Sequence, residues 1–288
     1  MPNTKIISIT LLAMFAFSAN SLLCRAALSE TTIDASSFTT IRLVSGAIML
    51  AVLSWQRNRT YPTEGSWAGG LSLFLYAAGF SYAYMALPTG AGALILFGAV
   101  QVTMIGFGFA KGERLNWKQT LGFLFAFAGL LWLLAPGVHS PPIIGSALML
   151  IAGVAWGAYS LLGRSNQKPL ETTAGNFVRS LPFALLLSLL FIQQTSLDAR
   201  GIGLAIASGA IASGIGYALW YTALPMLRST YAATLQLSVP VLAAISGIVL
   251  LNETFSTQLI LASTAVLGGI ALFILAGHST TKKGKPRH

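Results

Sequence analysis

Charged residues are scarce in this sequence. Only 8% of its 288 residues are Asp, Glu, Lys or Arg, whereas a typical soluble domain has about 25%. The chain is instead 55% hydrophobic, with a mean hydropathy of +0.74. This balance excludes an ordinary soluble domain and indicates a protein whose surface faces lipid.

Residues that carry enzyme and metal chemistry are also few. The lone cysteine, Cys24, rules out an intramolecular disulfide. The three histidines, His139, His278 and His288, fall in a predicted loop and in the C-terminal region, where they cannot build a metal cluster or a catalytic triad. All seven carboxylates fall in predicted loops or at span ends. We therefore expect no enzyme, no cofactor and no metal, and a carrier that works through a carboxylate buried at midplane is disfavoured.

Apolar sequence is abundant, and it comes in segments of about 18–22 residues, the length at which a helix crosses a bilayer. The sequence predicts an all-α polytopic membrane protein with ten transmembrane helices. The predicted spans are at about 5–25, 36–55, 66–87, 90–110, 117–136, 142–163, 172–193, 201–224, 229–250 and 257–277.

Basic residues gather on one side of this topology. With a cytoplasmic N-terminus, the cytoplasmic side holds 13 of the 17 Lys and Arg residues: Lys5, Arg57, Arg59, Lys111, Arg114, Lys118, Arg164, Lys168, Arg228, Lys282, Lys283, Lys285 and Arg287. This positive-inside bias predicts a multi-pass protein of the inner (plasma) membrane with both termini in the cytoplasm. The bias also explains the net charge of +10, so no nucleic-acid partner is expected.

A short phrase occurs twice, as YMALP at Tyr84–Pro88 and as YTALP at Tyr221–Pro225. The echo extends to other spans, because FSANSLLCR at 17–25 matches WGAYSLLGR at 156–164. The alignment predicts two five-helix repeats, residues 1–137 and 142–278, followed by a basic cytoplasmic tail at 279–288. Five crossings are odd, so the second repeat enters from the opposite side and is inverted. Inverted repeats in transporters place the substrate site at their interface, near midplane.

The whole pattern resembles a known family. Two inverted halves, Arg42 and Arg179 at matching places, Tyr-x-Ala-Leu-Pro closing spans three and eight, and the run YALWYTALPMLRSTYAATLQLSVPVL at 217–242 are typical of EamA-type members of the drug/metabolite transporter superfamily. The resemblance covers about residues 8–277. It departs at Val100, which aligns with Pro240 where the family often has proline in both halves.

The resemblance implies a secondary transporter that moves a small metabolite, an amino acid or a related compound, across the membrane by alternating access. It favours export (efflux) over uptake. A flippase for a lipid-linked amino sugar is the alternative within transport, and a membrane-embedded enzyme or sensor is the alternative from another class. The expected partners are a small-molecule substrate and membrane lipid, and the sequence also allows a homodimer.

Polar and aromatic side chains inside the spans are the candidates for a substrate cavity. Arg42 and Arg179 either offer a guanidinium to an anionic substrate or satisfy headgroups and carbonyls near their span ends. Gln101 and Gln236 either line the cavity or hold helices together. The candidate cavity residues are Asn20, Arg42, Gln101, Trp156, Tyr159, Arg179, Tyr217 and Gln236.

The repeated phrase itself predicts the gates. Tyr84 and Tyr221 each stand one helical turn before a proline that ends the span, at opposite faces of the membrane. We therefore predict that they are the outer and the inner gate. Two carboxylates after spans four and nine, Glu113 and Glu253, are expected to cap or tie short loops rather than to couple transport.

Overall fold

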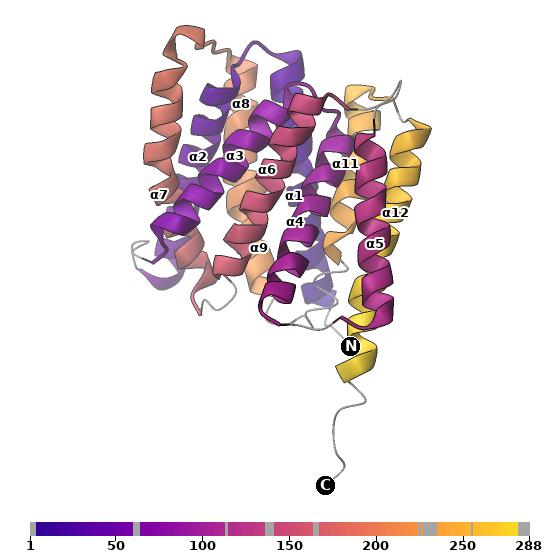
Figure 1. Ribbon diagram of the computed structural model, residues 1–288. Helices are drawn as coiled ribbons and strands as arrows, with labels where there is room; N and C mark the ends of the chain where they lie inside the picture. Colours follow the sequence, from indigo (N-terminus) through magenta and orange to yellow (C-terminus); the bar gives the residue numbers. More distant parts are fainter. Residues whose placement is uncertain are drawn as a thin grey trace.

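The computed structural model describes residues 4–59, 64–112, 115–135, 141–163, 167–223, 226, 235–254 and 256–281. Every regular element in these ranges is a helix (Figure 1). In chain order they are α1 (Thr4–Glu30), α2 (Ala35–Asn58), α3 (Trp67–Tyr84), α4 (Thr89–Ala110), α5 (Trp117–Leu134), α6 (Ile143–Gly163), α7 (Pro169–Leu190), η1 (Ile192–Gln194), α8 (Ala199–Ile206), η2 (Ala207–Ile215), α9 (Gly216–Ala223), α11 (Ser238–Leu251) and α12 (Thr257–Thr281).

An all-helical membrane protein is thus confirmed, but not all ten predicted spans meet the same standard. Among the described residues, eight helices are long and apolar enough to cross a membrane: α1, α2, α4, α5, α6, α7, the continuous stretch α8–η2–α9, and α12. Helix α3 is missing from this set because tyrosine, serine and glycine interrupt its apolar residues. Helix α11 is described over only 14 residues, fewer than the roughly 20 that a span needs.

The helices stand side by side as a bundle (Figure 1). Helices α5 and α12 pack along each other at one edge, and α2 and α7 pack together toward the opposite edge. Between them, α3 contacts α6 and α7, α4 contacts α6 and α11, and α1 contacts η2, α9 and α11. We call the end of the bundle where α1 begins the near end, and the end where α1 stops the far end.

Small residues let these helices approach closely. A Cβ atom added to Gly122 of α5 would lie 2.6 Å from the carbonyl oxygen of Gly269 in α12, and one added to Gly269 would lie 2.5 Å from the carbonyl oxygen of Gly122. A Cβ atom added to Gly153 of α6 would lie 2.5 Å from the Cβ atom of Ala99 in α4. Contacts of this kind replace hydrophobic burial as the force that holds helices together in lipid.

Two connections clasp each other at the far end. The carboxylate of Asp34 caps α2 by accepting from the Ser37 N–H and also accepts from the Ser196 N–H. The carboxylate of Asp198 caps α8 and accepts from the Thr32 N–H at 3.1 Å. Burial raises the pKa of Asp34, but hydrogen bonds from Ser36, Ser37 and Ser196 together outweigh burial and hold that pKa below its ordinary value.

The matching connection at the near end uses different side chains. Gly65, between α2 and α3, has a φ of +102°, a conformation that favours glycine. It brings the chain against α7, where the Asn176 side-chain oxygen accepts from the Ser66 N–H at 2.8 Å. Ser66 itself caps α3. The connection before α3 is therefore docked on the first half of α7.

The stretch that contains the predicted eighth span is not a uniform α-helix. Its middle, η2, is a nine-residue π-helix between α8 and α9, and such segments concentrate at functional sites. Helix η2 lies directly on α2, because a Cβ atom on Gly209 would fall 2.1 Å from the Arg42 carbonyl oxygen. The wider winding thus occurs where the stretch passes Arg42.

Candidate substrate site

A small group of polar side chains lies buried at the centre of the bundle. The Tyr76 hydroxyl of α3 accepts from Arg42 Nη2 at 3.0 Å and from Asn20 Nδ2 at 3.2 Å. The Asn20 side-chain oxygen in turn accepts from the Ser208 hydroxyl of η2 at 2.6 Å. We call these four residues the polar centre. They come from α1, α2, α3 and η2, so both predicted halves contribute to it.

Arg42 is the largest fully buried side chain among the described residues, with only 2% of its surface exposed. Its guanidinium lies 5.1 Å from the ring centre of Tyr76 and 4.9 Å from that of Phe80, within cation–π range. Its Nη1 atom has no hydrogen-bond partner within the described part of the chain. A buried donor without a partner is costly, so this atom is available to donate a hydrogen bond to a ligand.

Aromatic rings form one wall beside the polar centre. The Trp156 ring stacks on Tyr217 at 5.4 Å and on Tyr159 at 5.3 Å, and it meets the Tyr76 ring at 4.7 Å. Phe17 and Phe177 also contact the Tyr217 ring. We call Trp156, Tyr159 and Tyr217 the ring wall. A guanidinium beside stacked rings can bind an anionic group attached to an apolar or aromatic body.

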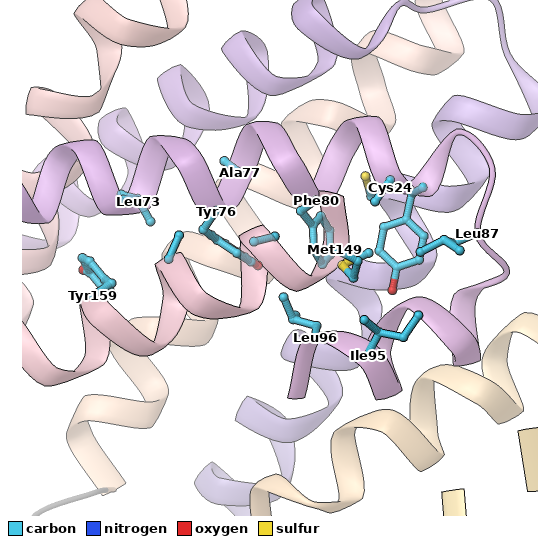
Figure 2. Close-up of a cluster of buried hydrophobic side chains, with 14 of the residues drawn as sticks. Cys24, Leu73, Tyr76, Ala77, Phe80, Leu87, Ile95, Leu96, Met149 and Tyr159 are labelled. Carbon is cyan, nitrogen blue, oxygen red and sulfur yellow. The ribbon is translucent and has the colours of Figure 1, made fainter. Parts of the chain in front are cut away.

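Helix α3 carries an aromatic ladder toward the far end. Tyr76, Phe80 and Tyr84 are four residues apart and so share a helix face, with ring centres 5.3 and 4.7 Å apart. Figure 2 shows Tyr76 and Phe80 extending from α3 toward the neighbouring helices, with Met149 beside Phe80 and with Leu96 and Ile95 close by. This ladder connects the polar centre to the position of the predicted outer gate.

The far end is closed over the ladder. Tyr84 is 0% exposed, and its hydroxyl donates to the Thr89 carbonyl at 3.2 Å. Arg25 donates to the Tyr84 and Met85 carbonyls at 2.9 and 3.0 Å. Glu253 accepts from the Thr89 N–H and hydroxyl, and so ties the start of α4 to the connection before α12. These contacts match the expectation that Glu253 caps or ties a short loop.

The other predicted residues have mixed placements. Arg179 lies near the near end, where Nη1 donates to the Glu64 and Gly175 carbonyls at 2.7 and 3.1 Å, and this geometry matches the carbonyl-satisfying alternative. Gln101 is half-buried in α4, and Gln236 is half-buried just before α11. Pro225, Glu113 and the side chain of Tyr221 lie outside the described residues. Of the eight predicted cavity residues, the structure brings together Asn20, Arg42, Trp156, Tyr159 and Tyr217.

Two members of the polar centre were missed in the sequence. Tyr76 was detectable, because Tyr76, Phe80 and Tyr84 recur every four residues on one helix face. Ser208 carries no such signal. Its hydroxyl donates to Asn20, 188 positions away in the sequence, and the alternation of small and apolar residues around it does not indicate that contact.

A separate groove opens on the side of the bundle between α2 and the α8–η2 stretch. Its volume is about 490 Å³, and it is lined by Thr40, Ile41, Val44, Ser45, Ile48, Met49, Val52, Ile206 and Ala210. The lining is almost entirely apolar, so the groove suits an acyl chain rather than a polar metabolite.

The bundle of apolar helices around a buried polar centre defines a multi-pass membrane protein. The chain matches the EamA-like transporter family over residues 4–135 and again over 143–275, and it belongs to that family. It is 56% identical to an uncharacterized protein of Pseudomonas aeruginosa over 95% of this chain and 96% of that one.

More distant relatives have names that state a substrate. The chain is 25% identical to an Escherichia coli protein named "Probable amino-acid metabolite efflux pump", over 70% of this chain and 74% of that one. It is 31% identical to the E. coli threonine/homoserine exporter over 48% of each chain. A crystal structure superposes with a TM-score of 0.65, covering 93% of this chain and 97% of the other at 21% identity, which shows a shared fold.

Proposed function

We propose that this protein is a secondary transporter that exports an amino acid or a related small metabolite across the inner membrane by alternating access. The observation that carries the proposal is the polar centre, a buried group of hydrogen-bonding side chains beside stacked rings, placed within membrane-spanning helices. Polar groups at such depth are costly unless they serve a pathway. The efflux and exporter names of the relatives support a small metabolite as cargo.

An inverted repeat supports alternating access. In our scheme, residues 1–137 and 142–278 are equivalent halves, followed by the basic tail at 279–288. Under this scheme the helix contacts come in equivalent pairs. Helix α1 packs on η2–α9 and α11, and its counterpart α6 packs on α3 and α4. In addition, α2 packs on its counterpart α7, α4 on α11, and α5 on α12. The two separate family matches, one in each half, agree with it.

The cycle then follows from the closed far end. We assign the near end, with both termini, to the cytoplasm, so that the far end faces outward. With Tyr84, Arg25 and Glu253 sealing the far end, cargo reaches the polar centre from the cytoplasm. Rocking of one half against the other opens the far end as the near end closes. We propose that the site serves transport and not an enzyme reaction, and we propose no cofactor and no nucleic-acid partner. A homodimer is compatible with this scheme.

The test is a comparison of metabolites in the medium of cells that lack, contain or overproduce the protein. Asn20→Ala and Trp156→Ala should abolish the excess of the exported compound at equal protein level. The control Trp132→Ala removes a ring that is 57% exposed on α5 and should leave export unchanged. If no metabolite differs, or if the Trp132 and Trp156 variants behave alike, the proposal is wrong.

The lateral groove favours one alternative cargo, a lipid-linked amino sugar. An acyl chain could occupy the groove between α2 and η2 while its headgroup reaches the interior. Filling the groove with Val44→Trp or Ala210→Trp would then stop transport, whereas Ile245→Trp, at a position exposed on α11, would not. Export that is unaffected by both groove variants rules out the flippase.

A further inference from the structure

The polar centre carries a positive charge that no ion pair balances in the described part of the chain. A guanidinium stays protonated in proteins, and that of Arg42 is buried. The titratable side chains around it are Tyr76, Cys24 and Tyr217, and none of these three is a carboxylate. In the described part of the chain, the ion pairs join Arg25 to Glu253, Lys168 to Glu64 and Arg200 to Glu30, at the two ends of the bundle.

The hydrogen bonds inside the polar centre leave two donor groups available to a ligand. The Tyr76 oxygen accepts from both Arg42 and Asn20, so its lone pairs are taken and its own hydrogen is left to donate. The Asn20 oxygen is already engaged by Ser208. Arg42 Nη1 is a second donor without a partner among the described residues. Two neighbouring groups therefore offer hydrogens, while the lone pairs of the Tyr76 oxygen are taken.

We propose that the polar centre selects a carboxylate whose overall charge is −1, attached to an apolar or aromatic body. The carboxylate accepts from Arg42 Nη1 and the Tyr76 hydroxyl, and the body lies against the ring wall. This inference rests on the proposed function and narrows its substrate class. A 2-hydroxy acid, a 2-oxo acid or an N-acylated amino acid fits it.

A zwitterionic amino acid fits less well, for two reasons. Its ammonium group could not use the Tyr76 oxygen, which already accepts from Arg42 and Asn20. Its zero net charge would also leave the buried guanidinium unbalanced, whereas a monoanion makes the occupied site neutral. Charges in a site of low polarity are stable only when paired.

Binding of matched compounds to the purified full-length protein tests this inference. Phenyllactate, phenylalanine and phenylalaninamide share one body and differ in charge at neutral pH, and 2-hydroxy-4-methylpentanoate with leucine repeats the comparison with an aliphatic body. Quenching of tryptophan fluorescence and the shift in melting temperature report binding. We expect each hydroxy acid to bind at least tenfold more tightly than its amino acid, and the amide to bind least.

Variants connect this preference to the residues. Arg42→Gln should lower hydroxy-acid affinity at least tenfold and abolish the preference over the amino acid. Tyr76→Phe, which removes only the hydroxyl, should lower that affinity several-fold even if the Arg42 variant fails to fold. Arg57→Gln, which changes an exposed arginine at the end of the same helix, should bind as the native protein does.

Three results would overturn the inference: equal or tighter binding of the amino acids, full hydroxy-acid affinity in both the Arg42 and the Tyr76 variant, or no binding by any compound. These outcomes are separate from failure of the proposed function. If cells export an amino acid while the hydroxy acids do not bind, only the monoanion preference is wrong. If the hydroxy acids bind but no metabolite reaches the medium, binding stands and export is wrong.

Discussion

Arg25 of α1 and Glu253, between α11 and α12, form an ion pair of 3.4 Å across the two predicted halves at the far end. The side chains are only 20% and 13% exposed. Between them they hold the turn from α3 to α4, because Arg25 donates to the Tyr84 carbonyl and Glu253 accepts from the Thr89 N–H. This ion pair thus connects the first copy of the repeated phrase, Tyr84–Pro88, to both predicted halves.

Breaking this pair should open the far end. Glu253→Gln removes the charge that faces Arg25 and the N-terminus of α4, a loss of about 1–3 kcal/mol for a partly buried charged hydrogen bond. In a Cys24→Ser, Tyr84→Cys background, a thiol reagent added from outside should react faster. Glu30→Gln, which breaks the more exposed pair with Arg200, is the control. Equal rates in the Glu253 variant and its parent would show that the ion pair does not hold the far end closed.

Tyr84 and Tyr221, the tyrosines of the repeated phrase, should change exposure in opposite directions during transport. Under alternating access the same interface closes one mouth as it opens the other. With Tyr84→Cys and Tyr221→Cys made separately in the Cys24→Ser background, added substrate should raise the labelling rate of one cysteine and lower that of the other. A rise in both rates, or no change in either, would assign the tyrosines to the scaffold alone.

Arg42 should reduce the stability of the empty protein. Arg42→Met replaces the buried guanidinium by an apolar chain of similar length, and such exchanges are often neutral or stabilising, by up to about 4 kcal/mol. We expect a higher melting temperature without substrate and no transport. Arg57→Met on the exposed part of α2 should change neither. A lower melting temperature with transport retained would contradict the prediction.

The contact between the two far-end connections that Asp34 holds together should weaken in acid. Because the pKa of Asp34 in the folded protein lies below its ordinary value of 3.8, its ionised form stabilises the fold above about pH 4. That stability is lost as the pH falls through the lower, folded-state pKa. Asp34→Asn keeps a capping side chain without the titration, so unfolding monitored by circular dichroism should depend less on pH between about 4 and 2. An unchanged profile would mean that other groups set the acid response.

The orientation is tested by single cysteines at exposed positions. Gln194→Cys at the far end and Gln56→Cys at the near end are each made in the Cys24→Ser background. In intact cells a membrane-impermeant thiol reagent should label the first and not the second. Opposite labelling would reverse the inside and outside assigned from the basic residues.

Helix content and placement were predictable because a bilayer imposes length and apolarity on every span. The bounds of α4 and α6 fall within a few residues of the predicted spans at 90–110 and 142–163. Helix α1 extends past its predicted end at 25 to Glu30, and both Arg25 and Glu30 form ion pairs at the far end. Such pairs join distant parts of the chain, so no local pattern contains them.

The candidate site was predicted in its residue types more than in its contacts. The sequence placed Arg42 and Arg179 on an equal footing, since they align in the repeat. The structure separates them: Arg42 meets Tyr76 and Phe80 in the interior, whereas Arg179 meets the Glu64 carbonyl at the near end. The difference comes from what faces each arginine across the bundle, and a single sequence does not carry that information.

The π-helix η2 has wider turns, with more residues in each, than the α-helices on either side of it. If η2 rewinds to the tighter α form, the residues after it rotate about the helix axis. The rotation is about 100° for each residue by which the hydrogen-bond register shifts. Tyr217 would swing away from Trp156 while Ser208, at the start of η2, kept its bond to Asn20. Such a screw motion would dismantle the ring wall without moving the polar centre. Cross-linking of cysteines at Gly216 and Ala16, which now face each other, would detect it as a loss of reaction when substrate is added.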